Sequence, residues 1–320
     1  MILARRTSAI LLCVGALAAT SACGAGRGGD DRLAVSASLY ALEFLAERVG
    51  GDTAEVTGLT PAGTEPHDLT LDGKARAGLE ATDVVLYLGD GYQPDVEDAI
   101  ADLPEDAVTV DLLEAEGVSL LPPPAHGDEH SRDEHGDEHE EEHAEDEHEG
   151  SHDPHVWLDP AEMVVLSEAV AAAFAEADPD HADTYRANQE VLAKDLEALD
   201  GEFRDGLADC AATTIVTSHA AFGYLAEAYG LTQVPIAGLS PDDEPDPATL
   251  AEITDSARDA GAKTVFFEEA LPPKLAETVA REIGAGTDLL AVMEFAPEDG
   301  DYLTVMRGNL ERLRTGLDCR

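Results

Sequence analysis

Short apolar segments alternate with amphipathic helical segments along most of this chain, and this alternation limits the fold to a few architectures. In the first half, strands are expected at 33–38, 53–59, 83–88 and 107–110, and helices at 40–49, 71–80 and 93–102. In the second half, strands are expected at 213–218, 231–236, 263–267 and 288–293, and helices at 221–229, 247–260, 272–283 and 302–317. Such alternation indicates mostly parallel sheets with helices on both faces. We therefore predict an α/β fold of two similar lobes.

A long helical segment at 179–207 separates the two halves. Asp178 and Pro179 supply an N-cap and a first-turn proline. About 28 residues at about 1.5 Å each give a helix of about 40 Å, which suits a rod that joins two lobes, although a kinked helix or two helices remain an alternative. We place the N-terminal lobe at 33–178, the linking helix at 179–207 and the C-terminal lobe at 208–320.

The first residues are typical of an export signal. Two arginines precede an apolar stretch at 10–19 that is too short to anchor stably across a bilayer. Small residues then lead to Cys23, as in a bacterial lipoprotein-processing motif, with Thr20 where leucine is usual. We predict a lipoprotein signal peptide at 1–23, lipid on Cys23, a tether at 24–32 and a protein held outside the cytoplasm on the cell membrane. An ordinary signal peptide is the alternative.

Two cysteines, Cys210 and Cys319, remain after the signal peptide and the lipidated cysteine are set aside. An even number of cysteines in an exported protein favours a disulfide. We predict that this bond ties the C-terminus to the start of the second lobe. Two buried free thiols are the alternative.

Charge excludes some ligands. The formal net charge is −49, so phosphates of nucleic acids and anionic lipids would be repelled and cations would be attracted. A solvated acidic surface without a specific ligand explains most of this charge equally well.

The segment from 126 to 152 is rich in histidine and acidic residues and contains no apolar residue larger than alanine, so it cannot build a core. Its seven histidines are His126, His130, His135, His139, His143, His148 and His152. Histidine repeated beside carboxylates indicates weak binding of several zinc ions, which would make these auxiliary metal-binding residues. A solvated linker is the alternative.

Three other histidines lie where the predicted fold would place a ligand site. His219 follows a strand directly, His67 lies in a loop after another strand, and His155 stands where the chain becomes apolar again. Ligands of such sheets bind beyond the carboxyl ends of the strands. Neutral imidazoles suit zinc, and Asp68 or Asp153 could orient one of them. The three residues therefore form a candidate metal site.

Three segments carry a resemblance to a known family. They are Gly-Thr-Glu-Pro-His-Asp at 63–68, Asp-Pro-His-Val-Trp-Leu-Asp-Pro at 153–160 and Thr-Ser-His-Ala-Ala-Phe-Gly-Tyr at 217–224. In this order they resemble the metal-binding motifs of the cluster A-I substrate-binding proteins of metal ABC transporters, and most of all the zinc-specific, ZnuA-like branch. The resemblance extends over essentially the whole mature chain. It implies two Rossmann-like lobes with parallel sheets, joined by a long linking helix, with a metal site between them.

The resemblance also implies a set of ligands. His67, His155 and His219 occupy the ligand positions, and His219 favours zinc because the manganese branch usually has glutamate there. The family commonly has an aspartate after the last strand of the second lobe. This chain departs from that pattern, and Glu294 stands at the corresponding place, so it is our candidate for the fourth ligand. Glu65, a neighbouring acid or a water molecule are alternatives.

The implied function is that of a monomeric, extracytoplasmic receptor that captures Zn²⁺ and delivers it to an ABC permease without covalent chemistry. Glu268 and Glu269 follow another predicted strand, and we expect them beside the ligands. A manganese receptor of the same family and a metal buffer or adhesin are alternatives. A His₃ zinc hydrolase is another, and would need an open coordination position and a general base such as Glu65 or Glu268. The two HExxH matches, at 139–143 and 148–152, both lie in the histidine-rich segment, which cannot build a core.

Overall fold

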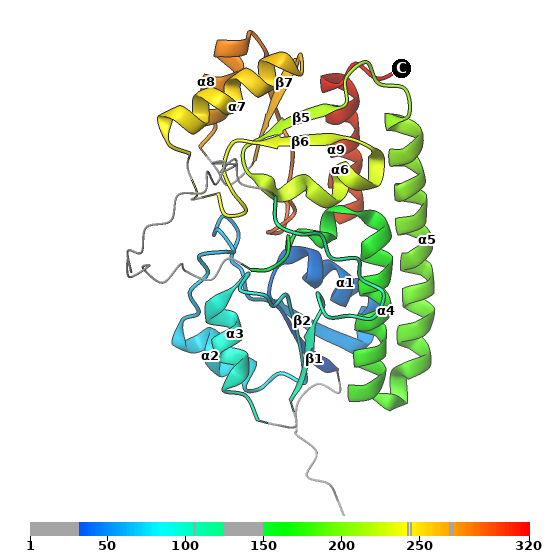
Figure 1. The fold of residues 1–320 in the computed structure, drawn as a ribbon. Coiled ribbons are helices and arrows are strands. Elements are labelled where there is room, and N and C mark those ends of the chain that lie inside the picture. Colours follow the sequence, from blue (N-terminus) through cyan, green and yellow to red (C-terminus); the bar gives the residue numbers. More distant parts are fainter. Residues whose placement is uncertain (1–31, 105–106, 125–149, 242, 244, 269–271) are drawn as a thin grey trace, which may run out of the picture. The chain divides into compact units, whose positions relative to one another are not determined.

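Two four-stranded parallel sheets, one in each lobe, form the framework of the chain (Figure 1). The computed structural model describes residues 32–104, 107–124, 150–241, 243, 245–268 and 272–320. The first sheet has the order β2-β1-β3-β4 and is made of β1 (Leu33–Ala37), β2 (Ala54–Gly58), β3 (Val84–Tyr87) and β4 (Val108–Asp111). The second has the order β6-β5-β7-β8 and is made of β5 (Thr214–Thr217), β6 (Thr232–Pro235), β7 (Thr264–Phe267) and β8 (Gly286–Leu289). The two lobes thus share one topology, as predicted.

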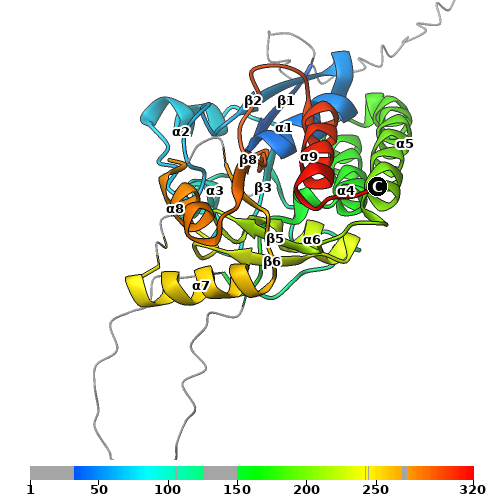
Figure 2. The ribbon, with the colours of Figure 1, turned by 90° about the horizontal axis from the view of Figure 1, so that it is seen from above.

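Helices cover both faces of each sheet. The first lobe contains α1 (Tyr40–Gly50), α2 (Gly73–Leu79) and α3 (Pro94–Ala101), and the second contains α6 (Gly223–Tyr229), α7 (Pro247–Asp259), α8 (Lys274–Ile283) and α9 (Tyr302–Gly316). Successive side chains of β3 serve opposite faces, since Val84 and Leu86 join the core with α1, whereas Val85 joins the core with α3. In Figure 1, α7 and α8 lie to the left of β7 and α9 lies to its right, and Figure 2 shows the same helices from above.

The main hydrophobic core is continuous between the lobes. It includes buried side chains of both sheets, and Phe44 of α1 stacks on Tyr302 of α9 with ring centroids 5.2 Å apart. A shared apolar core resists independent movement of the lobes, because separation would expose this surface to water. We retain lobe limits of 33–178 and 208–320 as a proposal.

The long helix α5 (Ala182–Leu207) supports both lobes and packs along α4 (Pro160–Ala177). α4 is followed by a 3₁₀ turn (Pro179–His181) and by α5, so the predicted helix begins with a tighter turn than expected. The carboxylate of Asp178 explains the turn, because it accepts hydrogen bonds from His181 Nδ1 at 2.6 Å and from the Tyr185 hydroxyl at 2.8 Å. The 26 residues of α5 extend about 39 Å and contact α1 and α4 in one lobe and α6 and α9 in the other (Figure 1).

The last strand differs from its prediction. We expected it at 288–293, but β8 ends at Leu289, and residues 290–293 leave the sheet while staying buried. Leu290 N still donates to the Phe267 carbonyl of β7 at 2.9 Å, but after it side chains hold the backbone. Asn309 bonds to both the N–H and the carbonyl of Ala291, at 2.9 and 2.8 Å, and Trp157 Nε1 donates to the Val292 carbonyl at 2.6 Å. Side chains of both lobes therefore hold the segment at 291–293, where strand pairing has ended.

A disulfide joins Cys210 and Cys319, as predicted. The same two residues form an isolated antiparallel bridge, and Arg320 N donates to the Asp209 carbonyl at 2.9 Å. The bond therefore fixes the C-terminus beside the segment that leads into β5.

Some predictions fall on residues that the structure does not describe. They are the signal peptide at 1–23 with Cys23, residues 24–31 of the tether, Glu269, and the six histidines of the histidine-rich segment from His126 to His148. Among the described residues, we find no helix with the length and apolar character required to span a membrane.

Candidate metal centre

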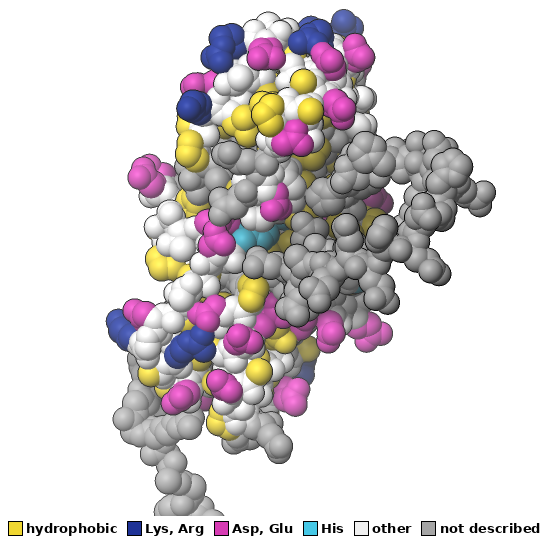
Figure 3. Space-filling view, turned by 60° about the vertical axis from the view of Figure 1, so that its left-hand side comes forward, with side chains coloured by type: hydrophobic (Ala, Val, Ile, Leu, Met, Phe, Trp, Pro, Cys, Tyr) yellow, Lys and Arg dark blue, Asp and Glu magenta, His cyan; other side chains and the backbone are white. Residues whose placement is uncertain are grey.

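The four residues predicted as metal ligands lie close together between the lobes. His67 lies in the loop after β2, His155 precedes a 3₁₀ turn at Val156–Leu158, and His219 follows β5 directly. Glu294 follows the buried segment after β8. One side-chain donor atom from each residue lies within 4.8 Å of the others. On the face drawn in Figure 3, histidine atoms are visible at one place, next to acidic side chains.

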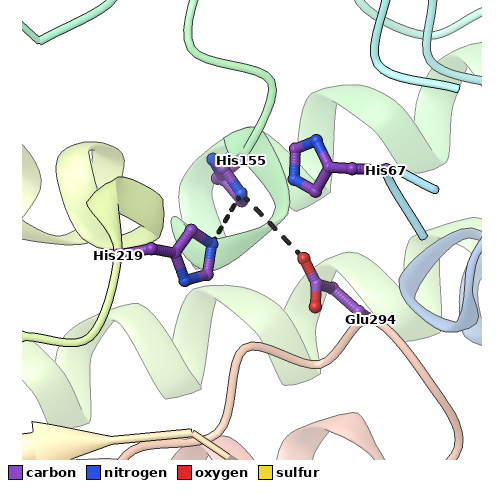
Figure 4. A group of neighbouring side chains, drawn as sticks. All are labelled: His67, His155, His219 and Glu294. Atoms are coloured by element: carbon purple, nitrogen blue, oxygen red, sulfur yellow. Dashed lines mark hydrogen bonds and ion pairs between the residues drawn. The ribbon is translucent and has the colours of Figure 1, made fainter. Parts of the chain in front are cut away.

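The distances approach those of a tetrahedral site. His155 Nε2 lies 3.4 Å from His219 Nε2 and 4.0 Å from Glu294 Oε1 (Figure 4). Donors at about 2.0–2.1 Å from a tetrahedral zinc ion are about 3.3 Å apart. The His155–His219 separation already matches this value, and the other separations, of at most 4.8 Å, would shorten around a bound ion.

His155 is fully buried and held by Asp153. The carboxylate oxygen Oδ1 of Asp153 contacts His155 Nδ1 at 2.8 Å and accepts from the His155 backbone N–H at 2.9 Å. Burial lowers the pKa of His155, although Asp153 opposes that shift. The bond at Nδ1 orients the ring so that Nε2 faces the other three residues. The structure thus places Asp153 in the orienting role for which the sequence offered two candidates.

His219 is also fully buried, and its partner is Glu268. Its Nδ1 lies 2.6 Å from Glu268 Oε2, although poorly aligned for a hydrogen bond, and its backbone N–H donates to Oε1 at 3.2 Å. Burial alone would lower the pKa of His219, but Glu268, Glu294 and Glu65 outweigh burial and raise it to about 9. Three carboxyl groups therefore lie near this buried imidazole, an arrangement that favours occupation by a cation.

His67 presents a nitrogen with no protein partner. Its Nε2 is buried and has no hydrogen bond among the described residues. Burial, followed by the nearby His155 and His219, lowers the pKa of His67 well below its ordinary value, so the imidazole is neutral. The ring packs edge-on against Tyr92, with centroids 4.6 Å apart. An unpartnered buried nitrogen with a free lone pair is suited to metal binding.

Glu294 completes the group with an oxygen. It is 4% exposed, and its Oε1 has no hydrogen bond among the described residues. Burial, with the nearby Glu65 as the next cause, raises the pKa of Glu294 well above its ordinary value. The pKa of Glu65 is raised as well, chiefly by burial. A cation among these carboxylates would remove the cost of their burial. Three nitrogens and one oxygen fit Zn²⁺ as a bound substrate.

Other candidates lie apart from this group. His152 bonds through Nδ1 to Asp90 Oδ2 at 3.1 Å, and His181 belongs to the turn before α5. Two aromatic residues beside the site were not predicted. Burial and Glu294 raise the pKa of Tyr92 well above its ordinary value, and the indole of Trp157 packs near His155. Neither residue has a spacing that would have pointed to the site.

Comparison with known proteins gives consistent results. A family model described as "Zinc-uptake complex component A periplasmic" matches residues 35–316. The zinc-binding lipoprotein AdcA of Streptococcus pneumoniae serotype 4 is 34% identical over 302 residues, which cover 93% of this chain and 58% of AdcA. This chain therefore spans little more than half the length of that relative.

A second relative matches over nearly its whole length. The high-affinity zinc uptake system protein ZnuA of Bacillus subtilis is 34% identical over 316 residues, which cover 97% of this chain and 95% of the relative. Among solved structures, the Zn(II)-bound ZnuA-like domain of Streptococcus pneumoniae AdcA matches with a TM-score of 0.71 at 32% identity. That match covers 90% of this chain and 99% of the domain.

Proposed function

Because this chain belongs to the ZnuA family, the zinc-uptake component A proteins, we propose that it is an extracytoplasmic receptor that binds Zn²⁺ and delivers it to an ABC permease. The observation that carries the proposal is the group of His67, His155, His219 and Glu294, the last three of them buried, whose donor atoms lie within 4.8 Å of one another. We assign these four residues as the zinc ligands. A lipid on Cys23 would hold the monomeric receptor at the membrane beside its permease.

The donor set argues against the alternatives. Manganese prefers oxygen donors, whereas three of the four donors here are imidazole nitrogens. A zinc hydrolase needs three protein ligands and one open position for water, but Glu294 would occupy the fourth position. With no position left for a substrate, the ion itself is the ligand that the site handles. We therefore favour a receptor over an enzyme.

Exchanging the ligand type tests the zinc assignment. Zn²⁺ binds more tightly than Mn²⁺ to nearly every such site, so the change in their ratio is more informative than the ratio itself. In competition titrations, His219→Glu is expected to reduce the preference for Zn²⁺ over Mn²⁺ by at least about tenfold, because an oxygen replaces a nitrogen. His219→Gln is the control, because glutamine has the same length as glutamate but carries no charge. A preference for Mn²⁺ in the unmodified protein would refute the proposal.

Removing the histidine-rich segment tests the buffer alternative. Asp153 N donates to the Leu121 carbonyl at 2.9 Å, so the two ends of the segment are adjacent and a short Gly-Ser linker can replace 126–149. Residues 150–152 should be kept, because Ser151 and His152 bond to Asp90. We expect one Zn²⁺ to bind with affinity within about threefold of the full chain, while weaker additional binding disappears.

One result of this deletion would contradict the proposal. If tight binding measured by competition with a chelating dye is lost while circular dichroism shows an intact fold, the segment is the main binder. The buffer or adhesin alternative would then replace the receptor, and the four proposed ligands would have another role.

A further inference from the structure

The hydroxyl of Tyr224 bridges two segments of the other lobe. It accepts a hydrogen bond from the Leu121 backbone N–H at 3.0 Å and donates one to the Asp153 carbonyl at 3.0 Å. Because Asp153 N also donates to the Leu121 carbonyl, at 2.9 Å, the three residues form a closed ring of hydrogen bonds. Tyr224 is 3% exposed and Asp153 2% exposed, so water competes little with these bonds. The residue that orients His155 is thus bound to α6 of the second lobe.

The neighbouring glycine brings α6 against the same aspartate. A Cβ added at Gly223 would lie 2.5 Å from Asp153 Oδ2, so a side chain there would force the carboxylate away. Gly223 has an ordinary helical φ of −58°, so glycine is needed here for space and not for backbone freedom. Asp153 is therefore confined on three sides: its carbonyl by Tyr224, Oδ2 by Gly223 and Oδ1 by His155.

Within the second lobe, the backbone connects Tyr224 closely to His219. Only a 3₁₀ turn (Ala220–Phe222) separates His219 from the start of α6. The His219 carbonyl accepts from the Thr217 hydroxyl at 2.7 Å and from Gln233 Nε2 at 3.0 Å, which fixes this backbone to the second sheet. A short chain of contacts thus runs from His219 through Tyr224 and Asp153 to His155.

This chain of contacts joins two nitrogens that lie 3.4 Å apart but belong to different lobes. Building on the proposed zinc site, we propose that Tyr224 is a positioning residue that sets the separation of His155 and His219 and thereby slows the release of Zn²⁺. Without the hydroxyl, Asp153 still binds His155, but the pair is no longer fixed to the lobe that carries His219. The Leu121 N–H also loses its partner, which leaves a part-buried donor unpaired.

Tyr224→Phe tests this role, with Tyr229→Phe as the matched control. Tyr229 lies on the same helix, and its hydroxyl lies 3.2 Å from Asp200 Oδ1, away from the four proposed ligands. Stopped-flow mixing of the Zn²⁺-loaded full chain with a chelator measures the rate of release. We expect Tyr224→Phe to release Zn²⁺ about tenfold faster, in line with the effects of residues that support metal ligands, and Tyr229→Phe to leave the rate unchanged.

Cobalt reports on ligand geometry independently of stability. The visible absorption bands of the Co²⁺-loaded protein should shift in Tyr224→Phe and stay unchanged in Tyr229→Phe. Gly223→Ala, which pushes on Asp153 from the helix side, should shift the bands and speed release as well. If Tyr224→Phe lowers only the melting temperature, with release rate and spectrum equal to the control, the proposed role is wrong.

A separate result distinguishes failure of this inference from failure of the receptor proposal. If the unmodified protein does not bind Zn²⁺ tightly, or binds it equally well without His155, the zinc site itself is wrong and the role of Tyr224 falls with it. If binding requires His155 but Tyr224→Phe and Tyr229→Phe behave alike, only the inference about Tyr224 is overturned.

Discussion

Replacing His155 by alanine is expected to weaken Zn²⁺ binding by about 10²–10³-fold. Four-ligand zinc sites bind with about 10–16 kcal/mol, so one ligand contributes roughly a quarter of that free energy, or about 3–4 kcal/mol. His155 should lie at the upper end of this range, because it is fully buried and Asp153 already orients it. Competition with a fluorescent chelator measures the affinity. The rise in melting temperature on adding Zn²⁺ should shrink correspondingly.

His152→Ala is a matched control for this substitution. It removes a histidine only three residues away, whose ring contacts Ser151 and Asp90 outside the proposed site. We expect its affinity to stay within about threefold of the unmodified protein, because no proposed ligand changes. Circular dichroism of both variants without metal would show whether the fold survives. If His155→Ala folds and binds Zn²⁺ as tightly as His152→Ala does, the assignment of His155 as a ligand is wrong.

The positions of three histidines relative to the predicted strands are sufficient to indicate the site. Of the eleven histidines in the chain, His67, His155 and His219 were chosen because strand ends or a return to apolar sequence placed them at one edge of the sheets. The structure does bring these three together with Glu294. This rule works because the carboxyl ends of parallel strands lie at the same edge of a sheet, whatever the lengths of the loops that follow them. Local sequence is therefore sufficient to indicate which residues meet, although not how closely.

Contacts between distant segments were beyond local sequence patterns. Residues 290–293 have the composition of a buried strand, but Trp157 and Asn309 hold the backbone of this segment, and these contacts cannot be foreseen from neighbouring residues. Glu268 could be expected near the ligands, yet only the fold shows that it faces His219. Tyr224 closes the motif at 217–224, but the motif did not indicate its role, because its hydrogen-bond partners lie in the other lobe. The hydrophobic periodicity of the sequence predicts which loops lie at the site, whereas the contacts that support the ligands depend on tertiary packing.

Removing the disulfide is expected to lower the free energy of unfolding by about 2–4 kcal/mol. Cys210 and Cys319 are separated by 109 residues, and closing a loop of about that length restricts the unfolded chain by up to about 4.7 kcal/mol. Cys210→Ser combined with Cys319→Ser avoids leaving one reactive thiol. Urea unfolding of the metal-free protein, monitored by circular dichroism, measures the change. Unfolding of the unmodified protein in a reductant should give a similar value.

Zinc affinity of the double variant should stay within about threefold, because β5 separates the disulfide from His219 at the opposite end of the strand. The hydrogen bonds from Ala211 and Ala212 to the Leu317 carbonyl, both at 3.1 Å, can still hold the C-terminus in place. The disulfide would then stabilise the lobe without shaping the metal site. A loss of affinity comparable to that of His155→Ala would show instead that the fastened C-terminus controls ligand geometry, and the independence argued from the strand direction would be wrong.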